Sequence, residues 1–191
     1  MANQVEKFGF RPVRKLDGSP FINAQNRYRI ASNYGTAIFQ GDLVVPVADG
    51  TIARHVAANT SAVVGVFNGC FYTDPTTQKP TWKNYYPGSV VASDITAFVL
   101  DDPDIVGKMD CDGAFAVADI FKDFNVTNVS GNTQSGISEV QLDFSASGVT
   151  IAFMLQAIDI SQNPDNSEAG AANVNVLVRI NNHFYRLNAG L

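Results

Sequence analysis

Short stretches in which every second residue is hydrophobic run through most of the chain after about residue 28. The clearest of them lie at 140–144, 149–155 and 174–180. Successive side chains of a strand point to opposite faces of a sheet, so this spacing predicts β-strands with one buried face. The hydrophobic positions shift by one between residues 155 and 158, which predicts a β-bulge near Gln156.

Other segments combine β-branched and aromatic residues with flanking Gly, Pro, Asn or Asp, which is also typical of strands. These further strands are expected at 38–47, 51–55, 62–72, 90–100, 105–109 and 184–187. Within the 62–72 segment, Gly65 and Gly69 indicate bulges or close approach of another backbone. Surface loops are expected at 73–88, 126–138 and 161–173, and a short helix at 114–124.

This order of elements predicts an all-β fold, with an antiparallel sandwich or jelly-roll-like domain as the main interpretation and a small barrel as the alternative. The composition agrees, because Val, Ile and Thr total 44 residues whereas Leu, Lys and Glu total only 17. Branched side chains lose rotamer freedom on a helix and fit a pleated sheet. We assign this domain to residues 34–191, and whether all its strands join one sandwich stays open.

Residues 1–33 lack this periodicity and differ in charge. Two prolines and two glycines lie within residues 8–21, and the residues before Pro12 and Pro20 favour extended backbone. Residues 1–29 hold six basic and two acidic side chains (+4), and residues 30–191 hold seven basic and 16 acidic ones (−9), which gives the net charge of −5. We therefore expect an extended cationic N-terminal arm over residues 1–33 that meets something negative. Its large apolar residues should pack on a surface, either of this chain or of a partner.

The sequence offers little support for catalysis. It contains no H-E-x-x-H, C-x-x-C, G-x-S-x-G, Walker or dinucleotide-binding pattern. The two histidines, His55 and His183, follow a strand and a turn signal, so we expect hydrogen-bonded surface or turn histidines. The acidic stretches at 101–104 and 110–113 are expected to be turns, because the calcium-loop pattern that starts at Asp110 has Phe121 where it needs Glu. We therefore predict a protein that is not an enzyme and uses no cofactor or metal.

Compartment and partners follow from similar counts. The start of the chain lacks the apolar core of an export signal, and no apolar run approaches the roughly 18 residues of a membrane span. Cys70 and Cys111 are therefore expected to be buried free thiols in a reducing compartment. The acidic body disfavours nucleic acid as a partner.

Three aromatic residues, Trp82, Tyr85 and Tyr86, fall within the expected 73–88 loop. Rings on a surface loop can stack on a sugar or cover a neighbouring subunit. They are therefore a candidate glycan or subunit contact, and a carbohydrate-binding module is the alternative function that they favour.

Three segments in this order resemble the head decoration (cement) proteins of short-tailed bacteriophages. They are residues 9–20 (GFRPVRKLDGSP), residues 98–104 (FVLDDPD), and residues 162–166 (QNPDN) continuing to residues 176–183 (VLVRINNH). The resemblance spans almost the whole chain, and the chain departs from it at 73–88 and 125–138. With a virion as the setting, the alternative function is a carbohydrate- or host-binding module of a virion fibre or tail.

The resemblance implies a non-enzymatic virion protein with a jelly-roll-like domain on the outer surface of the capsid, synthesised in the cytoplasm of the bacterial host. It also implies a symmetric homo-oligomer, a dimer in preference to a trimer, that bridges neighbouring major capsid proteins. The positions carried over as capsid contacts are those of the N-terminal arm: Phe10, Arg11, Arg14, Leu16 and Asp17.

Overall fold

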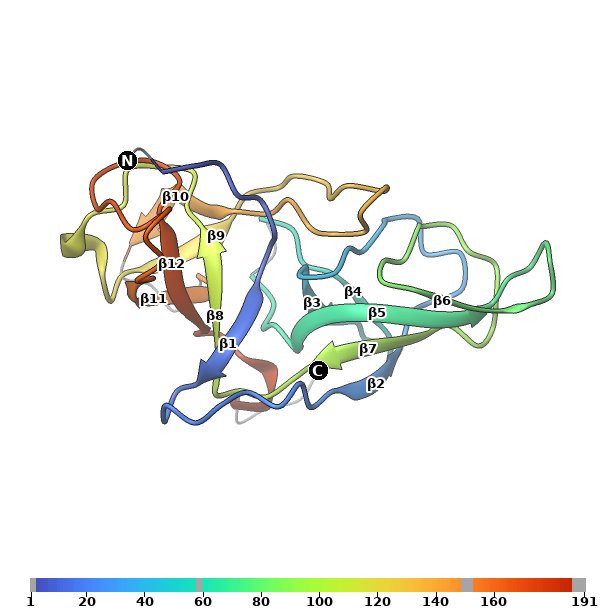
Figure 1. The fold of residues 1–191 in the computed structure, drawn as a ribbon. Helices are drawn as coiled ribbons and strands as arrows, with labels where there is room; N and C mark the ends of the chain where they lie inside the picture. The colour runs from blue at the N-terminus through green and yellow to red at the C-terminus, as the bar shows by residue number, and fades with distance from the viewer. Residues whose placement is uncertain (1–2, 58–59, 149–152, 187–191) are drawn as a thin grey trace.

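The computed structural model describes residues 3–57, 60–148 and 153–186, and these form an antiparallel all-β fold of two sheets (Figure 1). Sheet A has the order β1 (Arg11–Lys15), β8 (Ile105–Asp110), β12 (Asn175–Ile180), β11 (Leu155–Ile160), β9 (Asp123–Val126) and β10 (Leu142–Gly148). Sheet B has the order β2 (Asn26–Arg29), β7 (Thr96–Leu100), β5 (Gly65–Thr73), β3 (Leu43–Pro46) and β4 (Ile52–Arg54), and β6 (Pro80–Lys83) pairs with β5. The prediction of a sandwich-like all-β protein is confirmed.

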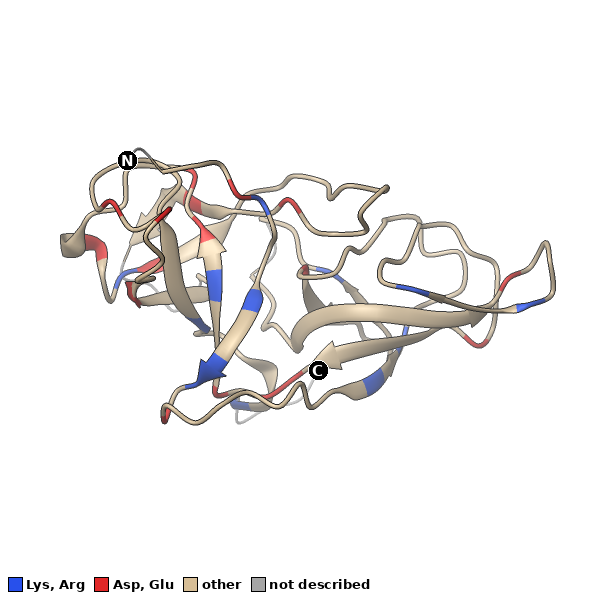
Figure 2. Cartoon of the chain, in the orientation of Figure 1, with Lys and Arg blue, Asp and Glu red and all other residues tan. Residues whose placement is uncertain are grey.

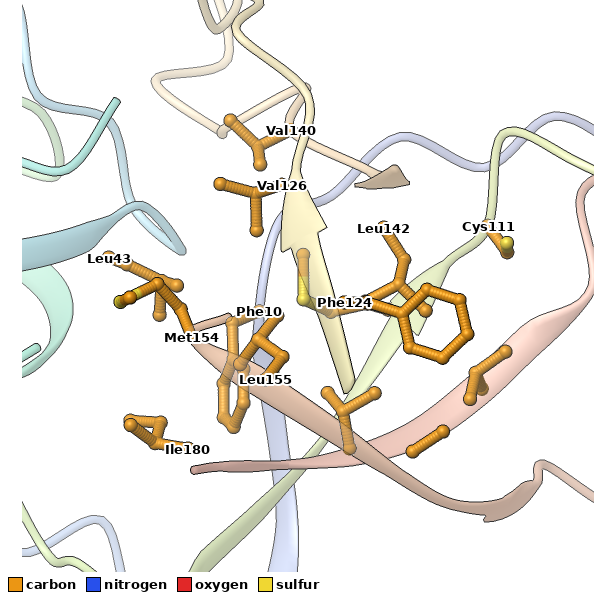
Figure 3. Close-up of a cluster of buried hydrophobic side chains, with 14 of the residues drawn as sticks. Phe10, Leu43, Cys111, Phe124, Val126, Val140, Leu142, Met154, Leu155 and Ile180 are labelled. Atoms are coloured by element: carbon orange, nitrogen blue, oxygen red, sulfur yellow. The ribbon is translucent and has the colours of Figure 1, made fainter. Parts of the chain in front are cut away.

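Two clusters of buried hydrophobic side chains fill the molecule, and the strands of sheet B contribute to both. The larger cluster lines the inner face of sheet A and includes Phe10, Phe124 and Leu155 (Figure 3). Along β3, Val44 belongs to the smaller cluster, whereas its neighbours on either side belong to the larger one. Because alternate side chains leave opposite faces of a strand, β3 is buried on both sides and joins the two clusters.

The N-terminal segment is built into both sheets, which differs from the expected extended arm. Phe8 and Phe10 are 7% and 2% exposed, β1 pairs with β8 at one edge of sheet A, and β2 pairs with β7 at one edge of sheet B. The connection between them, including Ile22 with 77% of its surface exposed, stays at the surface. The apolar residues that the sequence showed at positions 8 and 10 therefore pack on this chain itself.

Most strands form where the alternation predicted them, and both bulge predictions are confirmed. The register of β5 against β7 shifts between Phe67 and Gly69, and that of β11 against β12 shifts between Ala157 and Asp159. Residues 149–152 of the predicted 149–155 strand lie outside the described residues, residues 153–154 are not in a strand, and β11 begins only at Leu155.

Three local predictions are wrong. The expected helix at 114–124 is a single 3-10 turn, η1 (Val117–Asp119), followed by β9, because the backbone of residues 121–122 pairs with Ala157 of β11 instead. The expected loop at 73–88 contains β6, which extends sheet B along the far half of β5. The expected strand at 184–187 begins as another 3-10 turn, η2 (Phe184–Arg186), while residue 187 lies outside the described residues.

Candidate functional site

Four basic side chains from three strands share the outer face of sheet A. Arg11 of β1 lies opposite Lys108 of β8, which in turn lies opposite Leu177 of β12. In the next row Arg14 lies opposite Val106, which lies opposite Arg179. Directly opposed residues of antiparallel strands project from the same side of the sheet. We call this surface the cationic face and define it by Arg11, Arg14, Lys108 and Arg179; Figure 2 shows the basic positions on β1 and β8 side by side.

The direction of this face follows from the core on the other side. Ile105 and Met109 of β8 point into the larger hydrophobic cluster, so Val106 and Lys108 point outward. Gly107 lies on the inward side, where the ring of Phe10 covers it so closely that an added Cβ would come 2.2 Å from Phe10 Cε1. Phe10 is therefore a core residue that fixes β1 on β8, and its assignment as a capsid contact is wrong.

The Phe8 ring holds two of the cations in place. The Cζ of Arg11 lies 4.6 Å from the centroid of this ring, and the Nζ of Lys108 lies 5.0 Å from it. A cation over an aromatic face is attracted by the negative face of the ring quadrupole, which stabilises it by roughly 0.5–1 kcal/mol at an exposed site. Phe8 thus orients two positive groups without neutralising either charge.

Among the residues that the structure describes, no acid forms an ion pair with the four cations of this face. Arg179 Nε donates to Gln156 Oε1 at 2.8 Å, and Arg14 Nη1 donates to the Lys15 carbonyl at 3.0 Å, so both acceptors are neutral. The four ion pairs found within the described residues are formed by Lys15, Arg54, Lys122 and Arg186, none of which belongs to the cationic face. The cationic face therefore attracts anions over a distance set by the Debye length, about 8 Å at physiological ionic strength.

Acidic residues mark two margins of the face. At one end, Glu6 Oε2 accepts a hydrogen bond from Asn175 Nδ2, and Asp110 Oδ2 accepts one from Gln141. Burial raises the pKa of Asp110 to about 6, so this carboxyl starts to bind a proton at a pH where an ordinary aspartate is fully charged. On the far side, the exposed Asp159 lies opposite Leu177.

A groove runs beside the cationic face, between the N-terminal segment and sheet B. It has a volume of about 150 Å³, and its lining includes Phe8, Arg11, Phe67 and Ile137. An adjoining shallower hollow of about 330 Å³ shares Phe8, Arg11 and Ile137 and reaches Glu139. A partner that pairs with Arg11 can therefore also place an apolar side chain in the groove.

The remaining arm residues lie at the end of β1, away from the centre of the face. Leu16 is 41% exposed, and its backbone N–H donates to the Asp104 carbonyl. Asp17 accepts hydrogen bonds from the backbone and the hydroxyl of Ser19, which lower the pKa of its carboxyl. These contacts make the segment a tight turn with one exposed leucine, so only Arg11 and Arg14 of the predicted contacts lie on the cationic face.

Lys108 and Arg179 were missed by sequence reasoning. The alternation in 174–180 does place Arg179 on the polar side of its strand. No sequence signal, however, gives the register that sets β12 and β1 on either side of β8.

The three aromatic residues predicted as one platform are not brought together. Trp82 is 54% exposed on β6, whereas Tyr86 is fully buried and its hydroxyl donates to the Tyr34 carbonyl at 2.9 Å. The ring of Tyr85 stacks on Phe39 with 5.4 Å between centroids. A shared stacking surface of all three is therefore ruled out, and of the three only Trp82 is more than half exposed.

The residues considered for chemistry are mostly buried or paired. His55 and His183 are 4% and 0% exposed, so the surface alternative of their prediction is wrong, while His183 does lie directly before the 3-10 turn η2 and accepts a hydrogen bond from it. Burial lowers the pKa of His183 to about 4. Cys70 and Cys111 are free and buried, as predicted, and burial raises the pKa of each thiol to about 12.

The acidic side chains at 101, 102 and 104 form hydrogen bonds and ion pairs within the chain. Asp101 accepts hydrogen bonds from Asn26 and Tyr28, Asp102 pairs with Lys15 at 2.7 Å, and Asp104 pairs with Arg186. Among the described residues, no group of three or more His, Cys, Asp or Glu side chains is arranged to hold a metal ion. The same part of the chain contains no helix of the length and hydrophobicity that a membrane crossing requires.

The chain was compared with protein-family models, curated proteins and solved structures. No family model, no curated protein and no solved structure matches this chain.

Proposed function

We propose that this protein is a bacteriophage head decoration protein, which binds an acidic surface of the major capsid protein through the cationic face. The observation that carries the proposal is the convergence of Arg11, Arg14, Lys108 and Arg179 on one sheet face of a chain whose net charge is −5. The resemblance of three segments to such proteins supplies the partner, and two of these segments contribute residues to the face.

The chemistry of the face suits a fixed protein surface. Arginine presents a planar fork of donors that pairs bidentately with a carboxylate. Three adjacent strands hold the cations on a rigid sheet, so binding requires little ordering of side chains. The groove beside Arg11 adds a place for one apolar contact. Attachment therefore combines salt-dependent attraction with a short-range fit.

Decoration stabilises a shell by mass action. A protein that binds only the assembled lattice lowers the free energy of that lattice relative to separated subunits. We extend the proposal to a homodimer on the outer surface of the virion that bridges neighbouring capsid proteins. A dimer carries two cationic faces, so once one face has bound the capsid, the effective concentration of the other at its own binding site is raised.

The test is binding of the full chain to purified phage heads assembled without it, measured by co-sedimentation. We expect Arg11→Gln/Arg179→Gln to weaken binding at least about tenfold, because each charge-assisted hydrogen bond is worth about 1.5–3 kcal/mol. Raising the salt concentration should weaken the wild type more than this variant, since fewer charged contacts remain to be screened.

The matched control is Lys79→Gln/Lys83→Gln, which changes the net charge equally in the β5–β6 hairpin of sheet B. Equal losses in the two variants would mean that overall charge rather than the cationic face controls binding. Wild-type affinity in Arg11→Gln/Arg179→Gln, with heads that do bind the wild type, would reject this face as the contact.

A further inference from the structure

The outer face of sheet B carries a row of aromatic rings that the proposed capsid contact does not use. Phe71 of β5 is 38% exposed, Trp82 of β6 is 54% exposed, and Phe98 of β7 is half-buried. The alternate residues of these strands, such as Cys70, Ala97 and Val99, point into the smaller hydrophobic cluster. The aromatic row therefore projects to the side of the sheet away from that core.

A glycine bulge positions the indole of Trp82. Gly69 has φ +148° at the register shift of β5, and an added Cβ there would lie 2.6 Å from Trp82 Cζ2. Phe98 lies opposite Gly69, and its ring centroid is 5.1 Å from that of Trp82 with the planes tilted by 58°. Because position 69 has no side chain, the indole crosses β5 and meets Phe98.

Two arginines continue the row onto β2. Arg27 lies opposite Phe98 and Arg29 opposite Thr96, so both guanidinium groups project on the aromatic side. The Cζ of Arg27 is 5.8 Å from the Phe98 centroid. Neither arginine belongs to an ion pair within the described residues. We call Arg27, Arg29, Phe71, Trp82 and Phe98 the arginine–aromatic ridge.

Side-chain amides border the ridge. Asn68 Nδ2 donates to Gln25 Oε1 at 2.8 Å, and Gln40 Nε2 donates to Asn68 Oδ1 at 2.9 Å. Asn68 directly precedes Gly69 of the bulge, and these hydrogen bonds fix its amide, whose remaining donors and acceptors can meet hydroxyl groups. From β2 to β6 the ridge crosses four strands, which is about 14 Å at the usual strand spacing.

We propose that the arginine–aromatic ridge binds glycans that contain uronic acid residues. The flat C–H face of a pyranose ring stacks on the exposed indole of Trp82, which packs against Phe98, and a carboxylate of the glycan pairs with Arg27 or Arg29. Rings exposed on the face of a sheet suit sugar rings better than a protein partner, because protein hot spots seat their anchors in pockets. Charge complementarity selects acidic sugars, since neither arginine forms an ion pair with an acid in the described part of the chain.

The test uses a reporter that the chain already has. Trp82 is the single tryptophan of the protein, so its fluorescence reports directly on the ridge. The probes are oligogalacturonate, alginate and hyaluronate oligomers, together with methyl-esterified oligogalacturonate, which keeps the ring and loses the charge. We expect an acidic oligomer to change Trp82 emission in a saturable way, and the methyl ester to bind at least about tenfold more weakly.

Variants separate the two halves of the ridge. Arg27→Gln/Arg29→Gln should bind the acidic oligomers at least tenfold more weakly while its binding of the methyl ester is unchanged. Lys7→Gln/Lys122→Gln is the charge-matched control and should behave as the wild type. Calorimetry of Trp82→Ala should show no binding, whereas Phe121→Ala, which removes a ring 74% exposed elsewhere, should bind normally. Unfolding midpoints confirm that each variant is folded.

Three outcomes overturn the inference. The first is an unchanged Trp82 signal with all three acidic oligomers. The second is wild-type affinity in folded Trp82→Ala. The third is a Trp82→Ala variant that sediments as a smaller species than the wild type, which would make the ridge a contact between copies of this chain. None of these results depends on capsid binding, so the two proposals are tested separately.

Discussion

Burial changes the charge of His183 and Asp110 in opposite directions. His183 forms an isolated parallel β-bridge with Val63, and its Nδ1 accepts a hydrogen bond from the backbone N–H of Tyr185 at 3.2 Å. Burial lowers its pKa from 6.5 to about 4 and raises that of Asp110 from 3.8 to about 6. Both groups therefore favour the neutral form, as expected where low dielectric penalises charge.

The His183 shift predicts acid lability. Between pH 6.5 and about 4 the unfolded chain binds a proton at this histidine and the folded chain does not, so stability falls as the pH falls through this window. His183→Asn keeps an acceptor near Nδ1 and removes the titration. We expect the stability of wild type relative to this variant to drop by on the order of 1–3 kcal/mol between pH 7.5 and 4.5. Urea unfolding at each pH measures it.

The comparison with the variant matters because Asp110 acts in the opposite sense. Its raised pKa makes the folded state bind the extra proton between about pH 4 and 6, so its contribution to stability grows as the pH falls. Subtracting the His183→Asn curve cancels this contribution. A constant difference between wild type and His183→Asn from pH 4.5 to 7.5 would show that His183 titrates normally in the folded protein.

At the scale of elements, β1 behaves as a strand of sheet A because Phe10 and Gly107 fit each other. Its sequence looked like an arm, with Pro12, scattered charges and no alternation. The strand nevertheless pairs with β8 from Arg11 to Lys15, with an irregularity between Pro12 and Arg14. The ring of Phe10 over a glycine is a tertiary contact that no local pattern announces.

A double-mutant cycle tests this fit. Phe10→Ala empties a fully enclosed site and should lower the free energy of unfolding by about 3–5 kcal/mol. Gly107→Ala should lower it by about 1–3 kcal/mol, because the new Cβ overlaps the Phe10 ring. In the Phe10→Ala background the same Gly107→Ala change should lower it by less than about half as much, since the ring is gone. Urea unfolding of the four proteins measures the coupling; additive effects would mean that Phe10 does not pack on Gly107.

The sequence predicted elements best where one face is buried and the other is not. The segments at 105–109 and 174–180 are strands with nearly the expected limits. The helix predicted at 114–124 was wrong because the apolar residues of this segment lie on irregular backbone. Phe115 belongs to the larger cluster, while Phe121 is exposed and has a φ of +73°. Hydrophobic spacing alone does not distinguish these cases from a short helix.

At the scale of the whole molecule, the two hydrophobic clusters share strands, so they should unfold together. β3 gives Leu43 and Val45 to one cluster and Val44 to the other. In the same way, Leu100 of β7 belongs to the larger cluster and Val99 of β7 to the smaller one. Loss of either cluster removes one buried face from these strands, which destabilises the other.

Two native thiols report on this coupling. Cys111 belongs to the larger cluster and Cys70 to the smaller one, and both are fully buried. With a pKa of about 12 in the folded protein, each thiol should react only after its surroundings open. We expect pulse labelling with N-ethylmaleimide across a urea series to give midpoints that agree within about 0.5 kcal/mol in unfolding free energy. A distinctly lower midpoint for one cysteine would show two separately folding units.

The sequence by itself determined the class of fold and most strand positions, because alternation and β-branched composition act locally and leave a local record. It also determined that cations gather near the N-terminus and that both cysteines are buried. Only the tertiary structure decided that Phe10 faces inward, that Lys108 and Arg179 join Arg11 and Arg14, and that Trp82 meets Phe98 rather than Tyr86. The physical reason is that strand order and register are set by contacts between distant segments, and a shift of one residue reverses which side chains share a face.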